Sequence, residues 1–235
     1  ACSLAMSELG IEGKIVVPEN VHKNKIENIL NFGGKVEYYG DDCIHAEERA
    51  QEISKTTGAT YISPYNDEAI VFGQGTLGME ISRDLKHVDA IFVSVGGGGL
   101  ISGVGGYLKS INRSIQVYGV SPKNSCVMYE SLNAGEQLDL PSKPTLSDGT
   151  AGGVEFGSIT FEMCKEIIDD FTVVSEQEIA KGIHIGLEKN HQLIEGAAGA
   201  AIAGFINQKE KLKGQTVVLV MCGGNISSTV LKSIL

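Results

Sequence analysis

Four consecutive glycines, Gly96 to Gly99, end an apolar run that predicts a buried strand, and a helical pattern resumes at Leu100. Each glycine loses more backbone freedom on folding than any other residue. Without Cβ atoms, their N–H groups can surround an anion at the N-terminus of the next helix. The alternative is a tight strand-to-helix turn with close packing. A single glycine pair would favour that turn, whereas four glycines after a buried strand favour phosphate binding.

Specific residues argue against two common nucleotide sites. A Walker loop needs a lysine directly after its glycines, and the sequence there is LIS. A dinucleotide fingerprint counted from Gly97 needs its third glycine where Ser102 stands. It also needs a carboxylate at the end of the next strand, where Ser121 and Pro122 stand. A compact ligand with one phosphate remains, and pyridoxal phosphate is a candidate.

A second glycine pair occurs in MCGGN, residues 221–225, again between a predicted buried strand and a helix. Cys222 could contact the far end of a small aromatic ligand from this position. The alternative is a buried, inert thiol, which is the commoner state of a lone cysteine.

The elements that must position these residues alternate between strand and helix. The strands are rich in Val and Ile, and such strands, each followed by a helix, predict an α/β fold with parallel or mixed sheets covered by helices on both faces. The predicted strands are 14–19, 35–40, 60–64, 89–95, 115–121, 171–175 and 216–222. The predicted helices between them include 23–33, 44–57, 74–86, 100–112, 126–134 and 159–169. Ser175 is expected to cap the next helix, with Glu178 at the capping-box position.

Two lobes are expected, a small one over residues 1–63 and a large ligand-binding one over 64–235. The chain opens on apolar residues at helical spacing, such as Leu4 and Leu9, with no N-cap residue before them. We therefore expect that an upstream segment precedes Ala1, so that both lobes lack their N-terminal part.

Composition limits the class of partner. The net charge is -10 and the three arginines are scattered, so no basic stripe indicates a nucleic-acid partner. The five cysteines lack metal-ligand spacing and indicate reduced thiols in the cytoplasm. No apolar run reaches the roughly 18 residues of a membrane span.

Together these segments resemble the serine/threonine dehydratase and serine racemase family of pyridoxal phosphate enzymes, which have the tryptophan synthase β-like fold (fold type II). The resemblance covers nearly the whole chain, in the family's order. The stretches that carry it are VFGQGTLGMEI (71–81), VDAIFVSVGGGGLISG (88–103), TLSDGT (145–150), DDFTVVSEQEI (169–179), LIEGAAGAA (193–201) and VMCGGN (220–225).

The resemblance implies roles for eight residues. Gly96, Gly97, Gly98, Gly99 and Leu100 would bind the cofactor phosphate. Cys222 matches the position whose hydroxyl or thiol meets the pyridine nitrogen, and Gly149 matches the loop lining the site. Glu195 matches a carboxylate near the cofactor ring, with a charge at a helix N-terminus as the alternative. The resemblance also implies a homodimer.

The chain departs from the family at three places. The lysine that forms the Schiff base with the cofactor lies in an N-terminal motif, and none of the 16 lysines here has that context. We therefore expect no catalytic residue in this chain and place that lysine upstream of Ala1. Many relatives hold a divalent cation with a Glu and an Asp, where Ser121 and Val127 stand here, so no metal site is expected. The C-terminal regulatory domain of biosynthetic threonine deaminases has no counterpart, so isoleucine feedback is not expected.

The resulting hypothesis is a pyridoxal phosphate-dependent dehydratase that converts serine, threonine or a related β-hydroxy amino acid to a 2-oxo acid and ammonia when full length. The 235-residue chain by itself is expected to be inactive. An amino-acid racemase on the same scaffold and a non-catalytic fragment or pseudoenzyme stay open as alternatives. Which β-hydroxy amino acid is the substrate also stays open.

Overall fold

The computed structural model describes residues 1–235, which divide into two compact units, Ala1–Ile62 and Ser63–Leu235. The first unit contains a two-stranded parallel sheet of β1 (Lys14–Val17) and β2 (Lys35–Tyr38), in which Lys14 pairs with Lys35. Its helices are α1 (Cys2–Leu9), α2 (Lys23–Asn31) and α3 (Cys43–Thr57). The assignment of residues 1–63 to a small lobe and of residues 64–235 to a large ligand-binding lobe stays a prediction.

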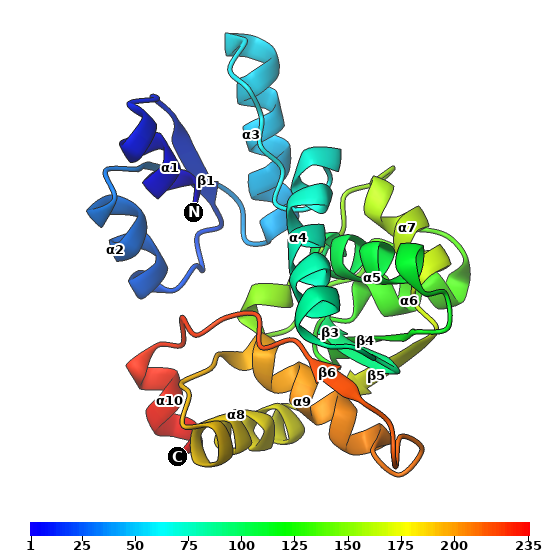
Figure 1. Ribbon diagram of the computed structural model, residues 1–235. Coiled ribbons are helices and arrows are strands. Elements are labelled where there is room, and N and C mark those ends of the chain that lie inside the picture. The colour runs from blue at the N-terminus through cyan, green and yellow to red at the C-terminus, as the bar shows by residue number, and fades with distance from the viewer. The chain divides into compact units, whose positions relative to one another are not determined.

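The second unit is built on a four-stranded parallel sheet with the order β5-β4-β3-β6 (Figure 1). The strands are β3 (Ala90–Ser94), β4 (Gln116–Pro122), β5 (Asp170–Val174) and β6 (Val217–Leu219). The longer helices are α4 (Glu68–Asp84), α5 (Gly99–Ile111), α7 (Ile159–Ile167), α8 (Glu176–Asn190) and α9 (Gly196–Gln208). The shorter ones are α6 (Val127–Ala134), the 3-10 helix η1 (Asp148–Thr150) and α10 (Ser228–Ile234).

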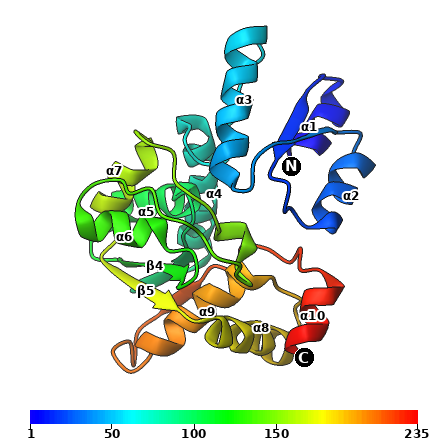
Figure 2. The ribbon, with the colours of Figure 1, turned by 180° about the vertical axis from the view of Figure 1, so that it is seen from behind.

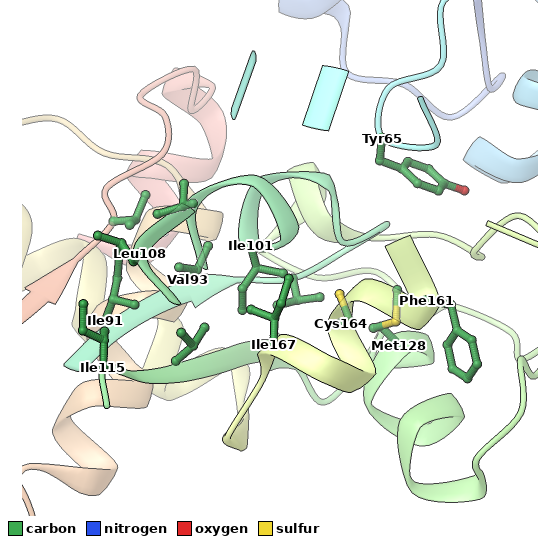
Figure 3. Close-up of a cluster of buried hydrophobic side chains, with 14 of the residues drawn as sticks. Tyr65, Ile91, Val93, Ile101, Leu108, Ile115, Met128, Phe161, Cys164 and Ile167 are labelled. Atoms are coloured by element: carbon green, nitrogen blue, oxygen red, sulfur yellow. The ribbon is translucent and has the colours of Figure 1, made fainter. Parts of the chain in front are cut away.

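The central strand β3 is buried on both faces, and its alternate side chains enter two different hydrophobic clusters. Ile91 and Val93 belong to a cluster with residues of α5, α6 and α7, which Figure 3 shows around Ile101 and Cys164. Ala90 and Phe92 belong to a cluster with residues of α8 and α9, two helices that lie side by side in Figure 2. The predicted α/β fold with helices on both faces of a parallel sheet is confirmed.

Most of the predicted elements are present, and one is wrong. No strand forms over 60–64, because this extended segment connects the two units and pairs with neither sheet. The helix expected from residue 74 begins at Glu68, where the Asp67 carboxylate accepts hydrogen bonds from the N–H groups of Ala69 and Ile70. The capping box of Ser175 and Glu178 at the start of α8 is confirmed. No helix of the structure is both long and apolar enough to span a bilayer.

Candidate functional site

A cavity of about 240 Å³ opens at the carboxyl end of the four-stranded sheet, within the second unit. Ligands of parallel-sheet proteins bind at this edge, where each strand passes into the loop before its helix. The lining residues are Pro64, Tyr65, Gln74, Ser94, Gly96, Gly97, Gly98, Gly99, Leu100, Gly149, Thr150, Ala197 and Cys222. Seven of the eight residues singled out from the sequence therefore line one cavity, and Glu195 is the exception.

At two positions of the glycine loop, the structure disfavours any residue with a Cβ atom. Gly98 is the N-cap of α5 and has a φ of 86°, in the left-handed region that favours glycine. A Cβ on Gly97 would overlap the aromatic ring of Tyr65. The loop is therefore packed closely between the Tyr65 ring and helix α7. The close packing expected of a tight strand-to-helix turn is present.

Close packing does not use the backbone donors of the loop. No N–H group from Gly96 to Leu100 donates a hydrogen bond to another group of the chain. These donors stand at the N-terminus of α5, where the helix dipole also favours negative charge. Unused N–H groups beside a cavity are the feature by which helix N-termini bind phosphate.

Cys222 contributes a thiol to the same cavity. Its Sγ lies 3.4 Å from the Oγ of Ser94, the last residue of β3. Burial raises the pKa of the Cys222 thiol, the Ser94 hydroxyl opposes this in part, and the Glu195 carboxylate adds to the rise. Part of the side chain is nevertheless exposed to the cavity. Cys222 is therefore a protonated, uncharged group near neutral pH, accessible to a ligand.

Glu195 occupies the N-cap position of α9, but its side chain does not cap that helix. Its Oε2 accepts a hydrogen bond from the N–H of Asn225 at 2.8 Å, and its own N–H donates to the carbonyl of Gly223 at 3.0 Å. A Cβ on Gly149 would lie 3.3 Å from its Oε1. Glu195 is thus hydrogen-bonded to the segment that follows Cys222 and lies close to Gly149, without lining the cavity.

Several lining residues were not found from the sequence. Ser94 could have been predicted from the sequence, because it is the last residue of the strand that precedes the glycine loop. Tyr65 could not have been predicted, since its position over the glycines depends on the packing of a distant segment. Ser121 and Val127 stand where many relatives are expected to have cation ligands. Ser121 donates from Oγ to the carbonyl of Val95 at 2.7 Å, and Val127 is buried. No cluster of three or more His, Cys, Asp or Glu side chains suited to a metal occurs in the structure.

The chain is similar in sequence to a family of known enzymes. Residues 1–223 match the family described as "Pyridoxal-phosphate dependent enzyme". The chain is 39% identical over 233 residues to an L-threonine ammonia-lyase of Thermotoga maritima, covering 99% of this chain and 58% of that protein. It is 35% identical to the catabolic L-threonine dehydratase of Escherichia coli K12, covering 95% of this chain and 68% of that protein.

Solved structures agree with this assignment. The processed form of threonine deaminase isoform 2 from Solanum lycopersicum superposes with a TM-score of 0.89 at 34% identity, over 99% of this chain and 68% of that one. Maize serine racemase superposes with a TM-score of 0.88 at 28% identity, over 98% of this chain and 71% of that one. The chain therefore spans about three fifths to seven tenths of the length of these four proteins.

Proposed function

Because the chain belongs to the family of pyridoxal-phosphate dependent enzymes, we propose that the full-length protein is a pyridoxal phosphate-dependent ammonia-lyase. It would convert threonine, serine or a related β-hydroxy amino acid to a 2-oxo acid and ammonia. The observation that carries this proposal is the match to proteins named threonine ammonia-lyase and threonine dehydratase over at least 95% of this chain.

The residues around the cavity fit the cofactor of this family. The glycine loop offers unused N–H donors and no side chains, which suits a phosphate ester. Ser94 and Cys222 place a hydroxyl and an uncharged thiol on the same wall, which suits a heteroaromatic nitrogen. The cavity has the dimensions of a compact ligand, and no basic side chain lines it.

When bound, pyridoxal phosphate supplies an electron-withdrawing ring that stabilises negative charge at the substrate Cα. Gly96 to Leu100 and the dipole of α5 would hold the phosphate and so fix the orientation of the ring. Cys222 would meet the ring nitrogen with a neutral thiol, which leaves that nitrogen largely unprotonated. Such limited electron withdrawal by the ring would suit an elimination, in which a β-hydroxyl leaves the substrate. Gly149 would line the site, with Glu195 close to it and hydrogen-bonded to the segment that follows Cys222.

The finer proposal concerns the lysine that binds the cofactor covalently and moves the substrate α-proton. None of the residues lining the cavity is a lysine. We propose that this lysine is not among residues 1–235, and that the 235-residue chain alone does not turn over amino acids. A homodimer and a cytoplasmic location are further proposals, and the location is supported by the free state of all five cysteines.

The proposal predicts that the full-length, cofactor-loaded protein releases a 2-oxo acid and ammonia in equal amounts from L-threonine or L-serine. The 2-oxo acid is measured by coupled reduction and ammonia by a separate assay, and borohydride reduction followed by peptide mapping locates the modified lysine. We expect that lysine outside residues 1–235. Conversion of L-serine to D-serine without 2-oxo acid would favour a racemase, and cofactor binding without either product would favour a non-catalytic protein.

A further inference from the structure

A fully buried hydroxyl holds the glycine loop from behind. Thr160, the second residue of α7, is 0% exposed, and its Oγ1 donates a hydrogen bond to the carbonyl of Gly97 at 2.6 Å. Thr160 does not line the cavity. It acts on the side of the loop that faces the hydrophobic cluster of α5, α6 and α7, which Figure 3 shows around Met128 and Cys164.

The direction of this carbonyl determines the direction of a donor. In a trans peptide the C=O of one residue and the N–H of the next point in opposite directions, and the chain has no cis peptide bonds. The Gly97 carbonyl points toward α7, so the Gly98 N–H points away from α7. That N–H has no acceptor within the chain, and Gly98 lines the cavity.

Backbone conformational preference does not set this peptide orientation, because glycine adopts positive and negative φ with similar ease on both sides of the bond. The position of Thr160 is itself well fixed. The N–H of Ile159 donates to Oδ1 of Asn66 at 3.0 Å, and Gln137 Nε2 donates to Oγ of Ser158 at 3.0 Å. The start of α7 is therefore tied to two other segments, and the Thr160 hydroxyl selects one of the orientations that two glycines allow.

We infer that Thr160 is a positioning residue of the phosphate site: its hydroxyl fixes the Gly97–Gly98 peptide so that the Gly98 N–H faces the phosphate. This inference rests on the proposed function, which places the cofactor phosphate at the loop. A purely structural role for Thr160 would be to satisfy a buried carbonyl. Such a role affects folding but not the difference in affinity between a ligand that has a phosphate and one that lacks it.

The test compares pyridoxine 5′-phosphate with pyridoxine, since neither has an aldehyde and neither can bond to a lysine. Both are titrated into the full-length apoprotein as wild type, Thr160→Val and Thr160→Ser. Thr160→Val keeps the shape and removes the donor, and we expect about a tenfold loss of affinity for the phosphate ester with affinity for pyridoxine unchanged. Thr160→Ser restores the donor and should restore the affinity. The ³¹P resonance of the bound ester should shift in the Val variant and not in the Ser variant.

Thr172→Val is the matched control, because Thr172 is a buried threonine on β5 whose hydroxyl accepts a hydrogen bond from Nε2 of Gln208 and makes none to the glycine loop. It should leave both affinities unchanged. Equal losses for the two ligands in Thr160→Val, or no loss for either, would overturn the inference while leaving the phosphate site in place. A wild-type protein that binds the ester no more tightly than pyridoxine would overturn both the inference and the proposed location of the phosphate.

Discussion

Replacing Gly98 by alanine is expected to weaken binding of pyridoxal phosphate to the full-length apoprotein by about 100-fold or more. An alanine at φ 86° costs about 1–2 kcal/mol of backbone strain. Its Cβ would also lie 2.8 Å from Sγ of Cys164 and 3.2 Å from Cβ of Thr160, so the loop must move away from α7. That movement displaces the N–H donors of the loop, and each tenfold loss of affinity corresponds to about 1.4 kcal/mol. The measurement is a titration of apoprotein followed by absorbance.

Gly135→Ala separates the backbone strain from the loss of the site. Gly135 ends α6 with a φ of 77°, and a Cβ there would meet no atom within 4 Å. The control should lose about 1 kcal/mol of stability and keep the wild-type affinity for pyridoxal phosphate. Gly98→Ala protein that is folded and binds the cofactor as tightly as Gly135→Ala protein would contradict the role of the loop.

The second large effect is expected for Gly196→Ala, which should lower the free energy of unfolding by about 3 kcal/mol or more. Gly196 is the first residue of α9, and a Cβ there would overlap the backbone carbonyl of Leu146. Backbone atoms cannot move aside as a flexible side chain can. The segment that continues to Gly149 must therefore separate from α9, which also exposes buried Ala197. Urea-induced unfolding followed by circular dichroism measures the change.

Gly73→Ala is the matched control for that substitution. Gly73 is exposed within α4, and a Cβ there would meet no atom within 4 Å. Alanine at an exposed helical position is expected to stabilise the protein by about 0.5–1 kcal/mol. If Gly196→Ala unfolded at the same urea concentration as the wild type, the close approach between α9 and the Leu146 segment would be wrong.

The features that were predictable from the sequence are those that local residues determine. The alternation of Val- and Ile-rich runs with helical patterns predicts the parallel sheet, and Ser175 with Glu178 predicts the start of α8. The glycine loop was recognisable because four glycines between a strand and a helix have few other uses. Cys222 was found for a related reason, since parallel strands end at one edge of the sheet.

The remaining features depend on contacts between distant segments. The ring of Tyr65 covers Gly97, and the Thr160 hydroxyl reaches the same residue from behind, across 63 positions of sequence. No local pattern marks either contact. The missed start of α4, residues 68–73, has a different cause, because Gly73 interrupts the helical pattern that follows the Asp67 cap. The false strand at 60–64 had suitable residues but no neighbouring strand to pair with.

A crystal structure of the full-length protein loaded with pyridoxal phosphate tests the proposed phosphate site most directly. We expect the phosphate oxygens about 2.7–3.1 Å from backbone nitrogens within Gly96 to Leu100, with the Cys222 thiol at the ring nitrogen. A phosphate bound elsewhere, with the N–H groups of the glycine loop facing only water, would contradict this expectation.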